Sequence, residues 1–132
     1  MVIEETLASW LFLVARICLA GVYLVSGVHK GVWYQKAVVE FQDARVPAIG
    51  LFLPMTIVLH LVGGMAMVTG IYAREAALAL ALFTVVATIK AHDFWTMSGQ
   101  QRLERSRIAM GNLGLVGGLI LLAMVGTGRL VL

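Results

Sequence analysis

The stretch KAHDFW ends one of the most apolar segments of this chain. It places Lys90, His92 and Asp93 directly before two aromatic side chains. A neutral imidazole paired with a carboxylate at a helix end can orient a ligand or transfer a proton. The same residues can also be the solvated end of a helix that leaves a membrane, with the aromatic pair in the interfacial belt. The residues alone leave both interpretations open.

Two further ionisable residues, Arg16 and His60, lie inside apolar segments rather than at their ends. A charged arginine at the centre of a bilayer costs at least ~2.5 to 3.5 kcal/mol, so Arg16 should face the protein interior, a cavity or a partner, unless it snorkels to the terminal side. His60 is either part of a pocket or a neutral imidazole that bonds a neighbouring helix, or Thr56 or Thr69 of its own helix. If their helices are neighbours, Arg16 and His60 lie at depths that allow an interaction.

The elements that must position these residues follow from composition. The chain has 132 residues, of which 61% are hydrophobic and 13% charged, and a mean hydropathy of +0.94, far above the apolar share of soluble domains. Four apolar segments, residues 7–28, 50–71, 76–91 and 108–125, approach or reach the ~20 residues that cross a bilayer. None shows the alternation of a strand. The sequence therefore predicts an all-α fold, an integral membrane four-helix bundle, as one domain over residues 1–132.

The first apolar segment is predicted to be a retained helix rather than a secretory signal. Glu4 and Glu5 precede it where a signal peptide carries basic residues, and its apolar part is too long.

The connection between the first two helices is too long for a tight turn. Within it Tyr34, Ala37, Val38 and Phe41 recur at helical spacing, before Pro47. This pattern predicts a short interfacial helix. By contrast, residues 72–75 leave room only for a tight hairpin between the second and third helices. Glycines where helices can approach closely are Gly27, Gly31, Gly63, Gly64, Gly114 and Gly118.

The basic residues are distributed unevenly between the two ends of the predicted bundle. One end holds Arg74 and Arg129, and the other holds Lys30, Lys36, Arg45, Lys90, Arg102, Arg105 and Arg107. The positive-inside rule therefore places the second end in the cytoplasm and both termini outside.

Successive helices cross the membrane in opposite directions. The end of the first helix, the end of the third and the start of the fourth therefore lie at this second end, and several polar residues stand there. Together with the two deeper residues, the candidates for a ligand pocket are Arg16, Ser26, His29, Lys30, His60, His92, Asp93, Trp95, Arg107 and Asn112. No residue is assigned a catalytic role.

Other chemistries find little support. No two of the three histidines are spaced as paired helical metal ligands, so no metal site is predicted. No flavin, haem, iron–sulfur or phosphate-loop motif is present. The single cysteine, Cys18, excludes an intramolecular disulfide, and a net charge of +3 is too small to predict nucleic-acid binding.

Five segments, taken in order, resemble the DoxX family of small four-helix membrane proteins. They are ARICLAGVYLVSGVHK, ARVP, HLVGGMAMVTGIYAREAAL, HDFW and GNLGLVGGLILLAMVGTGRL. The chain departs from the family pattern at His60, where an acidic residue is common, and at Gly111, where a lysine is common.

The resemblance implies a membrane subunit or anchor of a redox system in a bacterial-type inner membrane. The family takes its name from a subunit linked to thiosulfate:quinone oxidoreductase, and other members are associated with oxidative-stress and sulfur-redox partners. A quinone or a similar amphipathic redox molecule is the ligand that the resemblance allows, and Lys30, His92, Arg107 and Asn112 would supply donors for a quinone beside Trp95. The chain is not expected to be catalytic alone, so electrons would come from a partner.

The alternative is a non-enzymatic membrane scaffold or small-molecule carrier. Its basic segment QQRLERSR would recruit a soluble partner, and its polar residues would only lock helix packing. A quinone site or a carrier predicts a continuous cavity that reaches His60, whereas a pure scaffold predicts a closed core and an exposed patch at Arg102, Arg105 and Arg107. A homodimer through Gly114 and Gly118 is a further hypothesis.

Overall fold

The computed structural model describes residues 2–126 and is all-α in that range. The order is α1 (Val2–Val32), α2 (Tyr34–Asp43), α3 (Ile49–Thr69), α4 (Ala73–Ala91), the short 3₁₀ helix η1 (Phe94–Thr96) and α5 (Gly99–Val125). Four of these helices, α1, α3, α4 and α5, are long and apolar enough to cross a membrane. The predicted fold class is confirmed. Arg129, which contributes to the charge asymmetry, lies outside the described residues.

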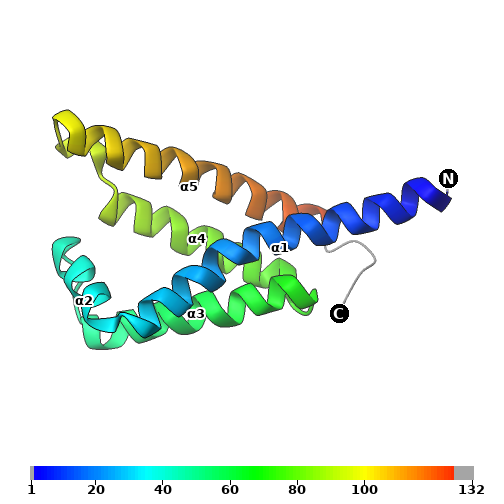
Figure 1. The fold of residues 1–132 in the computed structure, drawn as a ribbon, viewed down its shortest axis with the longest axis horizontal. Helices are drawn as coiled ribbons and strands as arrows, with labels where there is room; N and C mark the ends of the chain where they lie inside the picture. The colour runs from blue at the N-terminus through cyan, green and yellow to red at the C-terminus, as the bar shows by residue number, and fades with distance from the viewer. Residues whose placement is uncertain (1, 127–132) are drawn as a thin grey trace.

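The four long helices run lengthwise, and α2 lies at one end of the bundle, as Figure 1 shows. The same end holds the start of α3, the end of α4 and the start of α5, while the N-terminus of α1 lies at the other end. The short helix predicted from Tyr34 to Phe41 is therefore present as α2. Its Ala37 is buried against the bundle.

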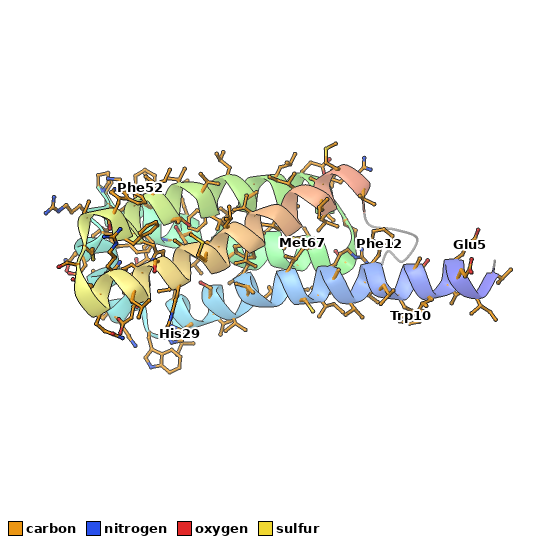
Figure 2. The ribbon with its side chains drawn as sticks, turned by 90° about the horizontal axis from the view of Figure 1, so that it is seen from above. Glu5, Trp10, Phe12, His29, Phe52 and Met67 are labelled. Carbon is orange, nitrogen blue, oxygen red and sulfur yellow. The ribbon has the colours of Figure 1, made fainter. Side chains whose placement is uncertain are left out.

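Two helices, α1 and α5, extend well beyond their apolar segments. The first turns of α1, with Glu5 and Trp10, extend past the other helices in Figures 1 and 2. Acidic residues in a first turn stabilise it through the helix dipole, and Glu4 and Glu5 stand there. In α5, the charged residues up to Arg107 are already helical.

Glycine allows the closest helix contacts, which join α1 to α3. A Cβ on Gly64 would lie 2.6 Å from Cγ of Leu24, and one on Gly27 would lie 3.1 Å from Cβ of His60. Glycine also allows the close contact of α3 with α4, because a Cβ on Gly63 would lie 3.0 Å from Leu80. Small residues thus set the distances between these helices.

Gly114 and Gly118, the two glycines predicted to form a homodimer contact, have different surroundings. A Cβ on Gly118 would lie 3.1 Å from Leu19 of α1, so Gly118 contributes to packing within the chain. Gly114 has no atom within 4 Å of that position. The homodimer itself stays a prediction.

Replacing Gly64 with alanine should destabilise the bundle by about 1 to 3 kcal/mol, because the added methyl group collides with Leu24. Gly117→Ala is the matched control, since its Cβ would meet nothing within 4 Å. Reversible unfolding in mixed detergent micelles measures both variants. Equal stability of the two would contradict the proposed α1–α3 packing.

Candidate functional site

The end of the bundle that carries α2 is also its basic end. Lys30 of α1, Lys36 of α2, Lys90 of α4 and Arg105 of α5 lie on elements that meet there (Figure 1). The predicted convergence of the helix ends is therefore present. We call this end the basic face.

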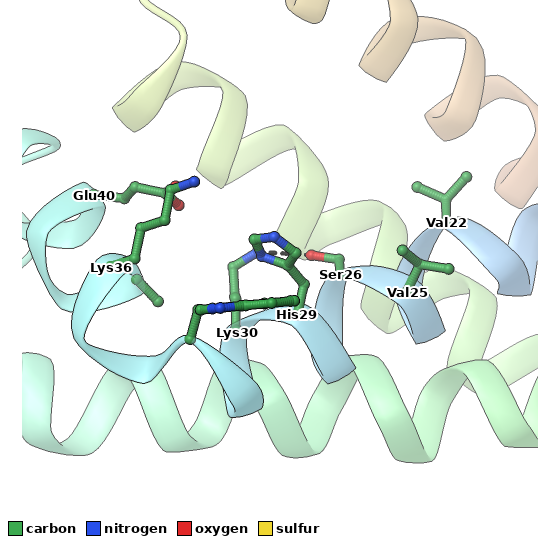
Figure 3. A pocket seen from close by; sticks show the side chains of 9 residues that line it. Val22, Val25, Ser26, His29, Lys30, Lys36 and Glu40 are labelled. Atoms are coloured by element: carbon green, nitrogen blue, oxygen red, sulfur yellow. Dashed lines mark hydrogen bonds between the residues drawn. The ribbon is translucent and has the colours of Figure 1, made fainter.

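A pocket of about 200 Å³ opens at the basic face, between α1 and α2. We call it the α1–α2 pocket. Figure 3 shows its lining, which consists of Val22, Val25, Ser26, His29, Lys30, Trp33, Lys36, Ala37 and Glu40. The α1 members recur every three or four residues and so form one face of that helix. Three of the predicted residues, Ser26, His29 and Lys30, come together here.

The polar groups of the pocket are ordered by local contacts. The Lys30 ammonium donates a hydrogen bond to the Ser26 hydroxyl over 2.6 Å. The rings of His29 and Trp33 lie with centroids 4.6 Å apart. Val22 and Val25 are exposed on the outer surface of α1, which faces lipid if the helix crosses a bilayer. The pocket therefore joins a polar wall to an apolar edge.

Deeper in the bundle, a chain of hydrogen bonds connects three helices. Thr84 of α4 donates its hydroxyl hydrogen to the carbonyl oxygen of Leu80 over 2.7 Å. The Tyr23 hydroxyl of α1, 2.6 Å from the Thr84 oxygen, must therefore donate. Asn112 of α5 donates to Thr88 over 2.9 Å, and Thr88 donates to the Thr84 carbonyl over 2.7 Å. The predicted candidate Asn112 is thus held in a structural network.

His60 lies beside this network with 3% of its surface exposed. It makes edge-to-face contacts with Tyr23 and Phe83, at centroid distances of 5.3 and 4.8 Å. Neither ring nitrogen has a hydrogen-bond partner among the described residues. A bond to Thr56 or Thr69, one of the alternatives from the sequence, is therefore not formed, and both hydroxyls donate to carbonyl oxygens of their own helix.

Arg16 is completely buried, so of the alternatives it faces the interior rather than snorkelling to an exposed end. No hydrogen bond joins it to His60, whose two nitrogens are unpartnered in the described part of the chain. Burial of both residues nevertheless concentrates ionisable groups inside the bundle, where they are costly and commonly functional.

The residues of the KAHDFW stretch have different environments in the structure. His92 is half-buried at the end of α4, and its Nδ1 has no hydrogen-bond partner among residues 2–126. Four charged side chains act on its ring: Arg105, Asp93, Glu40 and Lys30. Asp93 accepts a hydrogen bond from Thr96 over 3.0 Å.

Two other candidates, Trp95 and Arg107, are exposed and line neither of the two pockets described. Arg105 instead donates to the carbonyl oxygen of Ala91 and so ties the start of α5 to the end of α4.

A second pocket, of about 460 Å³, lies at the opposite end of the bundle. It is lined by Gly70, Tyr72, Ala73, Arg74, Glu75, Val125 and Gly126. None of the candidate residues contributes to it.

Comparison with known families gives a match to the DoxX family model over residues 11–93. The chain belongs to the DoxX family. The match includes the α1 wall of the pocket, all of α2 and the histidines at positions 60 and 92. The family resemblance seen in the sequence is confirmed.

Two inner membrane proteins of Escherichia coli K12 are similar to this DoxX chain. Inner membrane protein YqjF is 32% identical over 116 residues, which cover 88% of the chain and 84% of YqjF. Inner membrane protein YphA is 23% identical over 120 residues, which cover 91% of the chain and 86% of YphA. No solved structure matches the chain. These relatives support the predicted inner-membrane location.

Several residues of the site were missed in the sequence. They are Trp33, Lys36 and Glu40 in the pocket, and Tyr23, Thr84 and Thr88 in the buried network. Trp33 shares its helical face with Ser26, His29 and Lys30, and that spacing was available as a signal. The network was not readable, because isolated hydroxyls in apolar segments do not reveal their partners.

Removing the Tyr23 hydroxyl should weaken the connection between α1 and α4. Tyr23→Phe is expected to lower the free energy of unfolding by about 0.6 to 1.7 kcal/mol, the range for hydrogen bonds between membrane helices. Tyr34→Phe is the control, since no hydrogen bond of its hydroxyl is formed within residues 2–126. Chemical denaturation in detergent provides the measurement, and an effect no larger than that of the control contradicts the role of this bond.

His60→Phe should leave the free energy of unfolding unchanged or raise it. Each unpartnered buried polar atom carries a desolvation cost of about 1 to 3 kcal/mol, which an apolar ring avoids. The same denaturation measurement tests this variant. A loss above about 1 kcal/mol would mean that the imidazole gains a stabilising partner in the membrane.

Proposed function

We propose that this DoxX protein is a membrane subunit of a quinone-linked redox system, with the quinone head in the α1–α2 pocket. In this proposal the basic face points to the cytoplasm, and a soluble partner supplies the electrons. The subunit itself binds and orients the ligand. A bound quinone would supply an electron carrier that exchanges with the lipid phase.

The residues of the pocket fit such a head group. Quinone oxygens accept hydrogen bonds, and Ser26, His29 and Lys30 carry donors on one wall. The indole of Trp33 offers an aromatic surface beside them. The exposed Val22 and Val25 extend from the pocket along the outer surface of α1, where an apolar tail would lie in lipid. This combination of donors and an apolar edge is the observation that carries the proposal.

From the sequence, a quinone site was expected to form a cavity that reaches His60, and the α1–α2 pocket does not reach it. The closely packed surroundings of His60, behind the α1–α3 contacts, agree instead with the closed core expected of the scaffold. Lys30 connects the two regions, because it lines the pocket and its charge also acts on His60. In the proposal Lys30 therefore contacts the ligand head, whereas His60 influences it only from a distance.

The second candidate is a scaffold that recruits an acidic soluble protein. Arg102 and Arg107 are exposed on the first turns of α5, and Arg105 fixes this segment to α4 through Ala91. A fixed, basic helix start is a suitable docking surface. The scaffold needs no ligand in the α1–α2 pocket, which separates the two proposals.

Quinone should co-purify with the protein and depend on the pocket. Each protein is extracted in mild detergent and its bound quinone is measured by mass spectrometry. We expect the native chain to retain quinone. Lys30→Met and Ser26→Ala should retain at least about tenfold less, which corresponds to a loss of about 1.4 kcal/mol in binding free energy. Lys90→Met is the control, because Lys90 lies on the same face outside the pocket lining.

An empty native extract that also fails to take up added quinone would contradict the quinone proposal. Retention that is unchanged in all three variants would place the ligand elsewhere. The scaffold is tested separately by Arg102→Glu with Arg107→Glu, which should abolish partner association and leave quinone retention intact.

A further inference from the structure

The α1–α2 pocket carries an excess of positive charge. Its lining includes the ammonium groups of Lys30 and Lys36 but only one carboxylate, that of Glu40. The negative charge of Glu40 acts on Lys30, but neither lysine forms an ion pair within the described residues. Figure 3 shows Lys30 directed towards Ser26 on α1, while Lys36 and Glu40 extend from α2.

The ammonium of Lys30 is held in place for a ligand. It is half-buried, and one of its three N–H groups is directed to the Ser26 hydroxyl. The other two N–H groups are available to a ligand oxygen. Because the hydroxyl is neutral, this hydrogen bond positions the charge without cancelling it.

The surroundings strengthen the effect of this charge. Val22, Val25, Ala37 and Trp33 make up the apolar part of the lining, and charges interact more strongly beside such groups than in water. A neutral head group gains hydrogen bonds here. A head group with a negatively charged oxygen gains these bonds and a Coulomb attraction as well.

We propose that the α1–α2 pocket selects an amphipathic ligand whose head carries a negatively charged oxygen. This inference rests on the proposed function and specifies its ligand: among quinones, an acidic hydroxyquinone that is ionised at neutral pH is preferred to a neutral one. The head oxygen lies at Lys30 and Lys36, and the apolar tail follows Val25 and Val22 into the lipid. Anionic phospholipids share this chemistry and are the competing source.

The test uses a matched pair of probes, an alkyl hydroxynaphthoquinone and its neutral methyl ether. The full chain is placed in nanodiscs of zwitterionic lipid, with Trp10→Phe and Trp95→Phe so that Trp33 is the one remaining tryptophan. Quenching of Trp33 fluorescence reports occupancy of the pocket, after correction for partition into empty nanodiscs. We expect the anion to bind at least about tenfold more tightly than the ether, or about 1.4 kcal/mol.

Variants of opposite charge sign make the test specific. Lys30→Gln and Lys36→Gln should each reduce the preference for the anion, whereas Glu40→Gln should increase it, because it removes the one negative charge of the lining. Lys90→Gln should change nothing. Within residues 2–126 the Glu40 side chain forms no hydrogen bond that Glu40→Gln would remove, so this variant remains informative if a lysine variant does not fold.

The outcomes separate this inference from the proposed function. Equal binding of both probes overturns the inference and leaves a neutral quinone site. Binding of neither probe overturns both. A third outcome has two parts: nanodiscs with phosphatidylglycerol abolish hydroxyquinone binding, and lipid extraction finds phosphatidylglycerol on the native chain but not on Lys30→Gln. In that case the anion-selective site belongs to a phospholipid, and the quinone assignment fails.

Discussion

The close contact of α1 with α3 is the constraint on which the rest of this structure depends. A bilayer offers no water to polar side chains, so these must be buried between helices or lie at the ends. The absence of a side chain at Gly64, facing Leu24, lets the two helices approach closely enough to enclose Tyr23 and His60. Tyr23 can then reach Thr84 on α4 and connect a third helix. The same contact closes the core behind the pocket, so the pocket lies at the end of α1 rather than in the middle of the bundle.

The number and type of the membrane helices could be predicted from hydropathy, since each must present a long apolar segment to lipid. Their lengths could not. Hydropathy identifies the part of a helix that crosses the hydrocarbon, but a helix continues wherever its backbone hydrogen bonds can form. This explains why α5 starts at Gly99 although its apolar segment starts at Ile108. The short helix α2 was predictable because Tyr34, Ala37, Val38 and Phe41 recur at its period.

The membrane face of the site was predictable, but the grouping of its residues was not. Chain direction alone brings the ends of α1 and α4 to the same face. It does not show that α2 folds over α1, so that Lys36 and Glu40 complete a pocket with Lys30 while Trp95 remains outside. Asn112 was expected to be one of the residues of the ligand pocket, yet its amide connects α5 to Thr88. Membership of the DoxX family and similarity to two inner membrane proteins agree with the membrane fold, whereas the proposed quinone ligand rests on the chemistry of the pocket.

The central claim is that an amphipathic ligand binds between α1 and α2 with its head at the basic face. Photolabelling with a quinone analogue that carries a diazirine next to its head group tests this claim most directly, because mass spectrometry of the digested protein reports the labelled residues. We predict labels within residues 22–40, which contain the whole lining of the pocket, and their loss in the presence of excess unlabelled ligand. Competed labels confined to η1 and α5, around Trp95 and Arg107, would contradict the account and place the ligand on the opposite side of the basic face.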